Sequence, residues 1–272
     1  MIFNIPRDLN LLAPTIVPDL IRVGGAGDGG YVVSESSITS ADCLISFGLC
    51  DDWTFEHDFL VLHPNAKIHV YDHTVSQRLF YRTFRKKLYR FLLGRFNELP
   101  ELKRNWNIYK GYQHFFRGEV RHFRNRVHNK CDLPDDANID LIMSRVVSNK
   151  IFLKMDIEGG EYRVIKDILK YSDRITGLAI EFHDTEPLRE TFLNNIRELQ
   201  KHFTIVHVHP NNCGSVAADG LPECLEISFL RSDQLLPGCQ KRDHLPVGEL
   251  DAPCSPRKDE YQLRFDLSGL SS

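Results

Sequence analysis

Short apolar runs alternate with helical patterns along most of the chain. The runs are rich in Val, Ile and Phe, and this composition is typical of strands that are buried on both faces. We predict strands at 42–47, 67–71, 151–156, 177–182, 203–209 and 225–230, with 106–110 as a further candidate. Between them, apolar residues at helical spacing predict helices at 54–62, 162–170 and 187–202.

This alternation of strand and helix predicts the fold class. Strands separated by helices favour a mostly parallel sheet with helices on both faces, which is a Rossmann-like α/β architecture. The last two apolar runs have no helix between them, so we expect an antiparallel edge. We place the core domain at 41–232, with a flanking segment at 1–40, a helical insertion at 76–130, and a tail at 233–272 that wraps the domain or lies loose.

The composition is that of an ordinary globular protein, with 42% apolar and 26% charged residues. The start of the chain has no basic segment followed by an apolar one, and no window reaches the roughly 18 apolar residues of a membrane helix. We therefore expect a cytoplasmic protein without a transmembrane segment. Seven cysteines at wide spacing, without a CxxC pair, are expected to be reduced and mostly structural.

Positive charge is concentrated in the insertion. Between residues 78 and 130 the chain has fifteen Lys and Arg against three Glu, although its net charge is -3. Three interpretations remain open: a solvated helical face, a binding surface for an anionic acceptor such as a phosphorylated or uronic-acid glycan, or a nucleic-acid surface. Nucleic acid is the least favoured, because the rest of the chain is acidic and contains no recognisable RNA-binding module.

Polar residues follow the predicted strands at the ends where parallel sheets bind ligands. Gly48 follows the first strand and would let the backbone approach a ligand closely. Asp72 ends the second strand, where a carboxylate suits the two hydroxyls of a ribose. The strongest signal is the segment LKMDIEGGEY at 153–162, in which Asp156 and Glu158 leave a strand end and two glycines lead into a helix. Further polar residues at later strand ends are Glu181, His183, Asp184, His207, His209, Asn211 and Asn212.

These elements resemble the FkbM-type family of S-adenosylmethionine-dependent methyltransferases. The resemblance rests on the segment at 153–162, the IEFH strand at 180–183 and the DGGY element at 28–31, with weaker pieces at 22–24, 45–56 and 207–214. It covers roughly residues 20–232 and implies a Rossmann-like class I methyltransferase fold with S-adenosylmethionine as cofactor.

The resemblance also implies roles for particular residues. Gly48 would pass under the methionine moiety, Asp72 would hold the ribose, and Asp156 and Glu158 would lie beside the methionine amine and the acceptor. The residues assigned in this way to the cofactor are Arg22, Asp28, Gly30, Phe47, Gly48, Glu56, Asp72 and Asp156.

Methyl transfer to an oxygen requires a group that removes a proton. His183 is the first candidate, since the unperturbed pKa of histidine lies near neutrality, and His207 or His209 is the second. Asp156 and Glu158 complete the catalytic candidates. A divalent metal such as Mg²⁺ would find ligands in Asp156, Glu181, Asp184, Asn211 and Asn212.

The sequence therefore predicts an O-methyltransferase that acts on a hydroxyl of a sugar, glycan or related small polar acceptor, including an anionic one. Such an activity would be a carbohydrate modification. Two alternatives remain: a non-catalytic module of the same fold that binds a polyanion, and a metal-dependent hydrolase that uses the His, Asp and Glu cluster.

Overall fold

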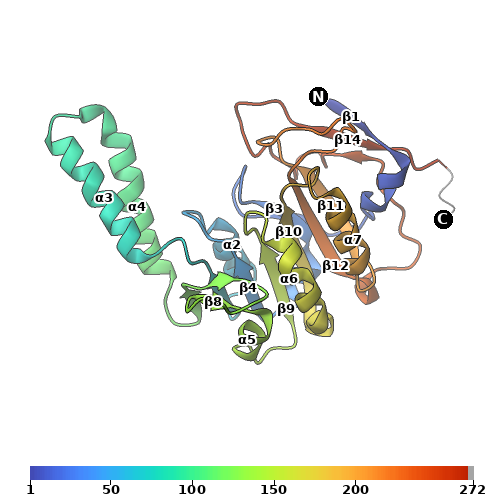
Figure 1. Ribbon diagram of the computed structural model, residues 1–272, viewed down its shortest axis with the longest axis horizontal. Helices are drawn as coiled ribbons and strands as arrows, with labels where there is room; N and C mark the ends of the chain where they lie inside the picture. The colour runs from blue at the N-terminus through green and yellow to red at the C-terminus, as the bar shows by residue number, and fades with distance from the viewer. Residues whose placement is uncertain (269–272) are drawn as a thin grey trace.

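The computed structural model describes residues 1–268 and has a seven-stranded sheet at its centre (Figure 1). In spatial order its strands are β11 (Phe203–Pro210), β12 (Leu225–Arg231), β10 (Ile175–Phe182), β9 (Ile151–Met155), β4 (Cys43–Phe47), β5 (Lys67–Tyr71) and β6 (Val120–Phe123). The six predicted core strands are all present, and β6 is an additional edge strand.

The sheet order places the ligand-binding edge. Strands β6, β5, β4, β9 and β10 are parallel, whereas β12 is antiparallel to both β10 and β11. The chain builds outward from β4 to β6 and then crosses to β9, so the order reverses between β4 and β9. In sheets of this kind ligands bind outside the carboxyl ends of the strands at that reversal. The Rossmann-like fold and the antiparallel edge are thus confirmed.

Helices cover both faces of the sheet (Figure 1). The helices are α1 (Glu35–Thr39), α2 (Thr54–Leu62), α5 (Ile139–Ser144), α6 (Glu161–Ile168) and α7 (Arg189–Leu199), with short 3-10 turns η1 (Arg7–Leu12), η3 (Leu169–Arg174) and η4 (Ser232–Gln234). Among residues 1–268 no helix has the length and apolar character needed to cross a membrane.

Strand alternation divides the core into two layers. Ile151, Leu153 and Met155 of β9 pack with α5, α6 and α7, whereas Phe152 packs on the opposite layer with α1 and α2. Lys154 follows the same alternation and therefore belongs to the Phe152 side of the sheet.

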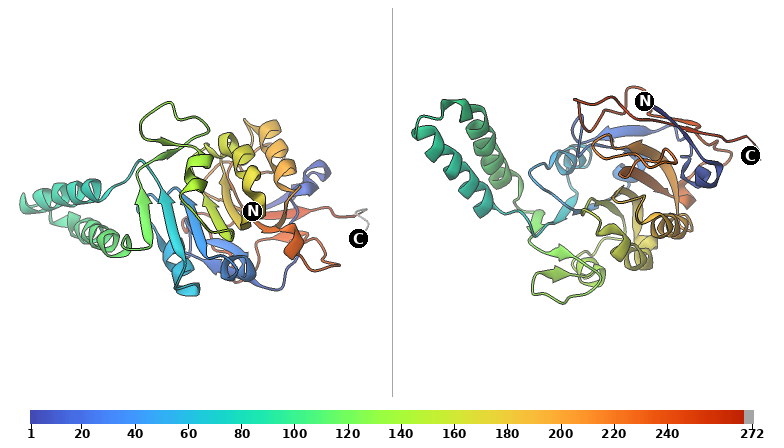
Figure 2. Two further views of the ribbon diagram at one scale, coloured as in Figure 1. Left: turned by 90° about the horizontal axis from the view of Figure 1, so that it is seen from below. Right: turned by 45° about the horizontal axis from the view of Figure 1, so that its top comes forward.

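Short strand pairs flank the central sheet. An antiparallel pair, β2 (Leu20–Val23) with β3 (Tyr31–Ser34), precedes β4, and a small parallel pair joins β7 (Arg126–Val127) to β8 (Asp136–Ala137). The N-terminal β1 (Ile2–Ile5) pairs in parallel with β14 (Gln262–Phe265), which also pairs with β13 (His244–Leu245). The two terminal segments therefore lie together, on the side of the molecule away from α3 and α4 (Figure 2).

Buried histidines fasten the C-terminal segment to the sheet. His207 Nε2 lies 3.0 Å from an oxygen of Asp251. His209 lies between two carboxylates, with Nδ1 3.0 Å from Glu226 and Nε2 2.8 Å from Glu260. Burial alone would lower the pKa of His209, but its hydrogen-bond partners raise it well above the usual range. Of the two expectations for the tail, wrapping the domain is the one observed for the described part of it.

The insertion is a helical hairpin followed by a strand. Helices α3 (Gln77–Leu92) and α4 (Leu99–Phe115), joined through the turn η2 (Phe96–Glu98), pack against each other and project from the body (Figure 1). The candidate strand at 106–110 is wrong, because this segment is part of α4. Trp106 packs there on Phe84 of α3, with 4.8 Å between the ring centroids, so its apolar residues serve a helix pair.

The anchoring histidine can be tested by replacement. We expect His209→Ala to lower the free energy of unfolding by about 3–5 kcal/mol, because Glu226 and Glu260 lose the cation between them and the buried Glu226 keeps only the thiol of Cys254. Urea unfolding measures the change. His244→Ala removes a histidine from an exposed pair with Asp243 and should change stability by less than about 0.5 kcal/mol. A loss below about 1 kcal/mol for His209→Ala would contradict the anchoring role.

Candidate functional site

A cavity of about 520 Å³ opens at the carboxyl ends of β4, β5 and β9. Its walls come from residues 28–29, the loop after β4, residues 71–74 after β5, residues 125–128, and the segment from Lys154 to Arg163. Asp72 and Asp156, predicted from separate strand ends, both line this one cavity. The sheet thus brings together the two carboxylates on which the sequence interpretation depended.

Gly48 allows the ends of β4 and β9 to lie in direct contact. Its φ is +85°, and a Cβ atom built on it would lie 1.8 Å from the backbone oxygen of Asp156. The backbone N–H of Asp156 donates to the carbonyl of Phe47 over 2.9 Å, and that of Gly48 donates to Tyr71 over 3.1 Å. No other residue type fits this position without moving the loop.

Asp72 holds the loop that follows β4. One of its oxygens accepts the N–H groups of Leu49 and Cys50 at 2.9 and 3.1 Å. The other accepts the N–H and hydroxyl of Thr74 at 2.7 and 2.6 Å. Burial raises the pKa of Asp72, but these bonds outweigh it and lower the pKa. Since a carboxylate has about four acceptor positions, these four hydrogen bonds occupy them, and the role of Asp72 as a ribose ligand stays a prediction.

Glu161 organises the loop that follows β9. Its side chain is fully buried, and one oxygen accepts the N–H groups of Ile157 and Gly159 at 3.1 and 3.3 Å. The same oxygen lies 3.2 Å from Nδ1 of His183. Glu158, by contrast, has a φ of +54° and an exposed side chain. The conformation of the DIEGGE loop therefore depends on Glu161, which was not among the candidate site residues predicted from the sequence.

His183 lies between two glutamates. Its Nε2 is 3.6 Å from Glu158 and its Nδ1 is 3.2 Å from Glu161. Burial lowers the pKa of His183, but the hydrogen bond to Glu161 and the charges of Glu181 and Glu161 raise it to about 9. The imidazole is then protonated at neutral pH, so the premise that selected it as the first candidate base does not hold in the fold.

Lys154 is a wall residue that sequence reasoning missed. Its side chain is buried, its Nζ lies 3.4 Å from the carbonyl of Gly48, and the ammonium sits over the ring of Tyr31 at 5.5 Å. Burial lowers the pKa of Lys154, but the charges of Glu56 and Asp156 raise it by more, so the pKa lies above its usual value. A single lysine within the apolar run IFLKM was the available signal.

Of the residues expected to hold the cofactor, some line the cavity and others only position the residues that line it. Asp28 lines the cavity, whereas Arg22 and Gly30 do not. Arg22 donates to the carbonyls of Gly25 and Gly27, both at 2.9 Å. A Cβ on Gly30 would lie 2.0 Å from the Gly25 oxygen. Arg22 and Gly30 thus fix the turn that presents Asp28.

The same division applies to the residues around the first loop. Glu56 lines the cavity and accepts a 2.5 Å hydrogen bond from the hydroxyl of Ser46. Phe47 is fully buried in the core on the α5–α7 side and does not reach the cavity. Its backbone carbonyl, rather than its side chain, supports the site.

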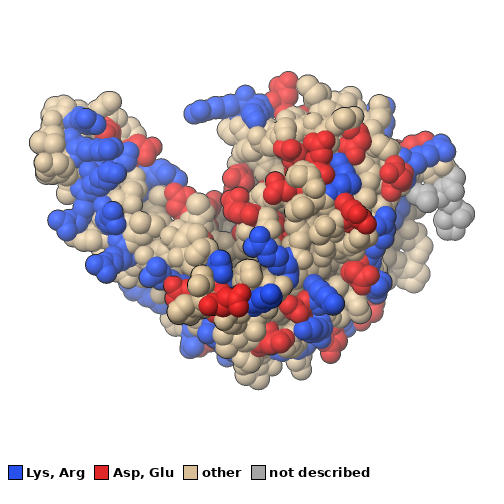
Figure 3. Space-filling model, viewed as in Figure 1, with Lys and Arg blue, Asp and Glu red and all other residues tan. Residues whose placement is uncertain are grey.

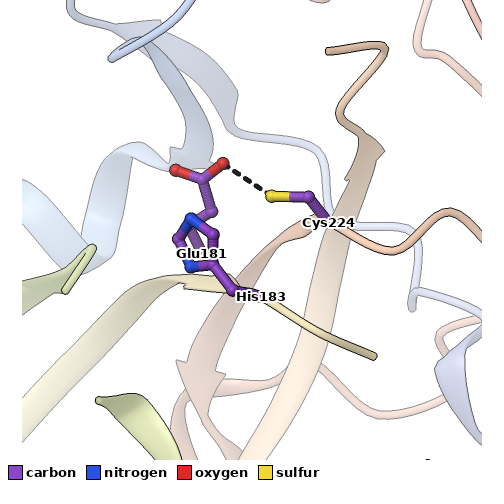
Figure 4. A group of neighbouring side chains, drawn as sticks. All are labelled: Glu181, His183 and Cys224. Atoms are coloured by element: carbon purple, nitrogen blue, oxygen red, sulfur yellow. Dashed lines mark hydrogen bonds between the residues drawn. The ribbon is translucent and has the colours of Figure 1, made fainter. Parts of the chain in front are cut away.

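A second polar cluster lies beside the cavity, at the end of β10 (Figure 4). Glu181 accepts hydrogen bonds from the amide of Asn211 and the thiol of Cys224, both at 2.8 Å. Burial, followed by the charges of Asp156 and Glu226, raises the pKa of Glu181 to about 8. This carboxyl group is therefore largely protonated at neutral pH, which weakens it as a metal ligand.

The structure does not gather the five predicted metal ligands into one group. Asn212 uses its amide on carbonyls of the C-terminal segment, at 3.0 Å for Ser255, and Asn211 is engaged with Glu181. Within residues 1–268, the groups whose ligand atoms lie within 4.8 Å of one another include Asp156 with Glu158 and His183, and none of them contains Asp184. A metal site remains a prediction, and Asp156 with Glu158 is the pair best placed for it.

His207 and His209 lie outside the cavity. They belong to β11, the sheet edge beyond β12, and their partners hold the C-terminal segment. Strand alternation correctly placed both on one face, but the sequence could not show that the end of the chain covers that face. Neither reaches the cavity that holds Asp72 and Asp156, so their role as candidate bases stays a prediction that the geometry of this cavity does not support.

Cationic and polar side chains also line the mouth of the cavity. Arg126, His128 and Arg163 line it, together with His73 and Asn125. Arg126 is paired with Asp136 at 2.8 Å, and Arg163 is exposed. Arg126 and His128, which belong to the basic block, thus line the cavity directly, whereas no hairpin residue does.

No protein-family model and no curated protein matches the chain. Solved structures with a similar arrangement include the Methanococcus jannaschii fibrillarin pre-rRNA processing protein, 10% identical with a TM-score of 0.38 over 72% of this chain and 68% of that one. A precorrin-6y C5,15-methyltransferase from Geobacter metallireducens is 9% identical, with a TM-score of 0.36 over 72% and 85% of the two chains. Similarity at this level adds no evidence about the fold beyond the strand order itself. Membership of the FkbM-type family stays a prediction.

The proton on His183 predicts a pH-dependent stability. Folding raises the pKa of His183 from 6.5 to about 9. The stability that protonated His183 adds to the folded protein is therefore complete below pH 6.5 and is lost as the pH rises to about 9. Its size is on the order of 3 kcal/mol at most. We expect His183→Gln to flatten unfolding free energies measured between pH 6 and about 10. His57→Gln, at an exposed histidine, should keep the wild-type slope, and an equal slope in His183→Gln would contradict the assignment.

Proposed function

We propose that the cavity binds S-adenosylmethionine and that the protein transfers the methyl group to an oxygen of a small polar acceptor. The observation that carries the proposal is the convergence of three strand ends on one cavity, with Gly48, Asp72 and Asp156 in its walls. This is the position at which an open α/β sheet binds its ligand.

The walls fit the charges of that cofactor. A volume of about 520 Å³ lies within the usual range for small-molecule sites. Gly48 exposes bare backbone beside the site, and the ammonium of Lys154 is the buried cation suited to the methionine carboxylate. Asp28 offers a carboxylate to the amine of the cofactor. Burial and the neighbouring acids Glu226 and Asp156 raise the pKa of Asp28, so a bound cation would favour its ionised form.

The cofactor supplies an electrophilic methyl group on a positively charged sulfur. The chain must hold the acceptor hydroxyl in line with that group and take up its proton as the new O–C bond forms. Asp156 is the carboxylate best placed to accept the proton. It lines the cavity beside Gly48, and it is less exposed than Glu158, which also lines the cavity. His183, being protonated, acts by positioning Glu158 and Glu161.

The cationic side chains at the cavity mouth support a polar acceptor, which can itself be anionic. Arg126, His128 and Arg163 would attract and orient a carboxylate or phosphate on the acceptor. A sugar, a uronic acid or a phosphorylated glycan combines such a group with the free hydroxyl that the reaction needs. The acceptor class is therefore proposed as a hydroxylated, optionally anionic, carbohydrate-like molecule.

Cofactor binding tests the proposal directly. We expect titration calorimetry to detect S-adenosylmethionine and S-adenosylhomocysteine binding to the wild type, and Gly48→Ala to weaken it by about 100-fold or more, because the new Cβ displaces the loop. Gly238→Ala is the matched control: its φ of +79° carries similar strain, but nothing lies within 4 Å of the added Cβ. No heat from folded wild-type protein would reject the proposal.

The proton acceptor is tested by turnover. Asp156→Asn keeps the shape of the side chain but removes the base, so we expect methyl transfer to fall by about 10²–10⁴-fold. Radiolabelled cofactor and a panel of neutral and acidic sugars provide the assay. Asp243→Asn, at an exposed carboxylate in the C-terminal segment, should leave turnover unchanged. Undiminished turnover in Asp156→Asn would remove this residue from the mechanism.

A further inference from the structure

The far end of the α3–α4 hairpin exposes a cluster of large apolar side chains. Tyr89, Leu92, Leu93 and Phe96 are each between 65% and 72% exposed, and Leu99 adjoins them at 39%. Helix α3 has 16 residues, so this end stands about 24 Å from the start of the hairpin. In Figures 1 and 2 the hairpin projects from the body with nothing packed against its end.

The apolar residues elsewhere in the hairpin have partners. Leu102 is buried between the helices, and Phe84 packs on Trp106. At the base, Trp53 of the body packs on Phe80 and other aromatic rings of the hairpin. At the far end Phe96 packs on Phe91, with 5.3 Å between the ring centroids, but Phe96 is still 68% exposed. The exposure of this end therefore needs another explanation.

The sides of the hairpin are strongly cationic. Residues 77–115 contain ten Lys and Arg and two Glu, a formal charge of +8. Glu98, near the end, is already surrounded by Lys87, Arg90 and Arg95 at 3.6–3.9 Å. In Figure 3 the Lys and Arg side chains run along the hairpin, and uncharged surface shows at its far end.

We propose that the hairpin docks the protein on an anionic lipid bilayer, with its apolar end inserted among the acyl chains near the headgroups. A convex apolar end bordered by Lys and Arg is the pattern of a segment that lies in the interface of a membrane. The basic sides meet the negative headgroups, and each nearby Lys or Arg strengthens the attraction. This binding is independent of the proposed methyl transfer.

A nucleic acid fits this end less well. Bases stack on aromatic rings, but three of the five exposed apolar residues are leucines, which offer no flat face to a base. Aliphatic side chains at a convex end do suit acyl chains. A polyanion would explain the Lys and Arg along the sides of the hairpin. An anionic bilayer explains both these cations and the exposed apolar residues at the far end.

The hairpin also touches the cavity. Arg104 of α4 forms a 2.5 Å ion pair with Asp51, which lines the cavity beside Gly48. A protein docked through the hairpin would therefore hold its cavity loop at a fixed place relative to the bilayer.

Vesicle sedimentation tests the docking. At about 0.1 M salt we expect the full-length protein to sediment with vesicles of phosphatidylcholine and phosphatidylserine, and weakly with phosphatidylcholine alone. The double variant Leu93→Asp with Phe96→Asp should bind at least about ten-fold more weakly. Val147→Asp with Leu236→Asp, at side chains 95% and 61% exposed elsewhere, is the matched control and should bind as the wild type.

Charge is tested separately from apolar insertion. Arg82→Glu with Lys86→Glu should also weaken binding by about ten-fold or more, whereas Lys150→Glu with Lys166→Glu should not.

Absence of sedimentation with phosphatidylserine vesicles would overturn the proposal. It would also be overturned if the Leu93 and Phe96 variant bound normally while single-stranded RNA competed with the vesicles, since that identifies a general polyanion surface. Circular dichroism confirms that each variant is folded, and unchanged cofactor binding separates this result from the proposed function.

Discussion

The backbone contact between the ends of β4 and β9 is the constraint on which the site depends. Asp156 donates its N–H to the carbonyl of Phe47, and Gly48 has no side chain to keep the two segments apart. Once this contact is fixed, the loop after β4 reaches Asp72 and the loop after β9 closes over Glu161. The cavity is the space that these two loops leave at the point where the strand order reverses.

Buried charge is the second constraint, and it is balanced locally. Glu56, Glu161 and Glu181 are all buried near the cavity, and isolated carboxylates there would be strongly unfavourable. Lys154 and the protonated His183 supply positive charge, and Glu181 avoids ionisation through its raised pKa. The cavity itself is lined by seven Asp and Glu against three Lys and Arg. This excess of acids favours a cationic ligand and is the electrostatic basis of the proposed cofactor.

The basic block separates into two structures with different surroundings. Its C-terminal part contributes Arg126 and His128 to the cavity mouth, where charge can act on an acceptor. Its helical part contacts the cavity loop through Arg104 and then projects away to exposed apolar side chains, where charge can act on a partner outside the molecule. Most of the C-terminal segment lies on the side of the body away from the hairpin (Figure 2), although Leu250 accepts a hydrogen bond from Arg22 in the turn that presents Asp28.

The sequence by itself determined the sheet and its ligand-binding edge, because buried strands and amphipathic helices are local patterns and their alternation restricts the topology. It also identified Gly48, Asp72 and Asp156, which lie at strand ends. Only the tertiary structure decided which polar residues face the cavity. His207 and His209 pair with carboxylates more than forty residues away, and Glu161 holds the proton on His183 by raising its pKa. Such partners depend on long-range packing, which no local pattern contains.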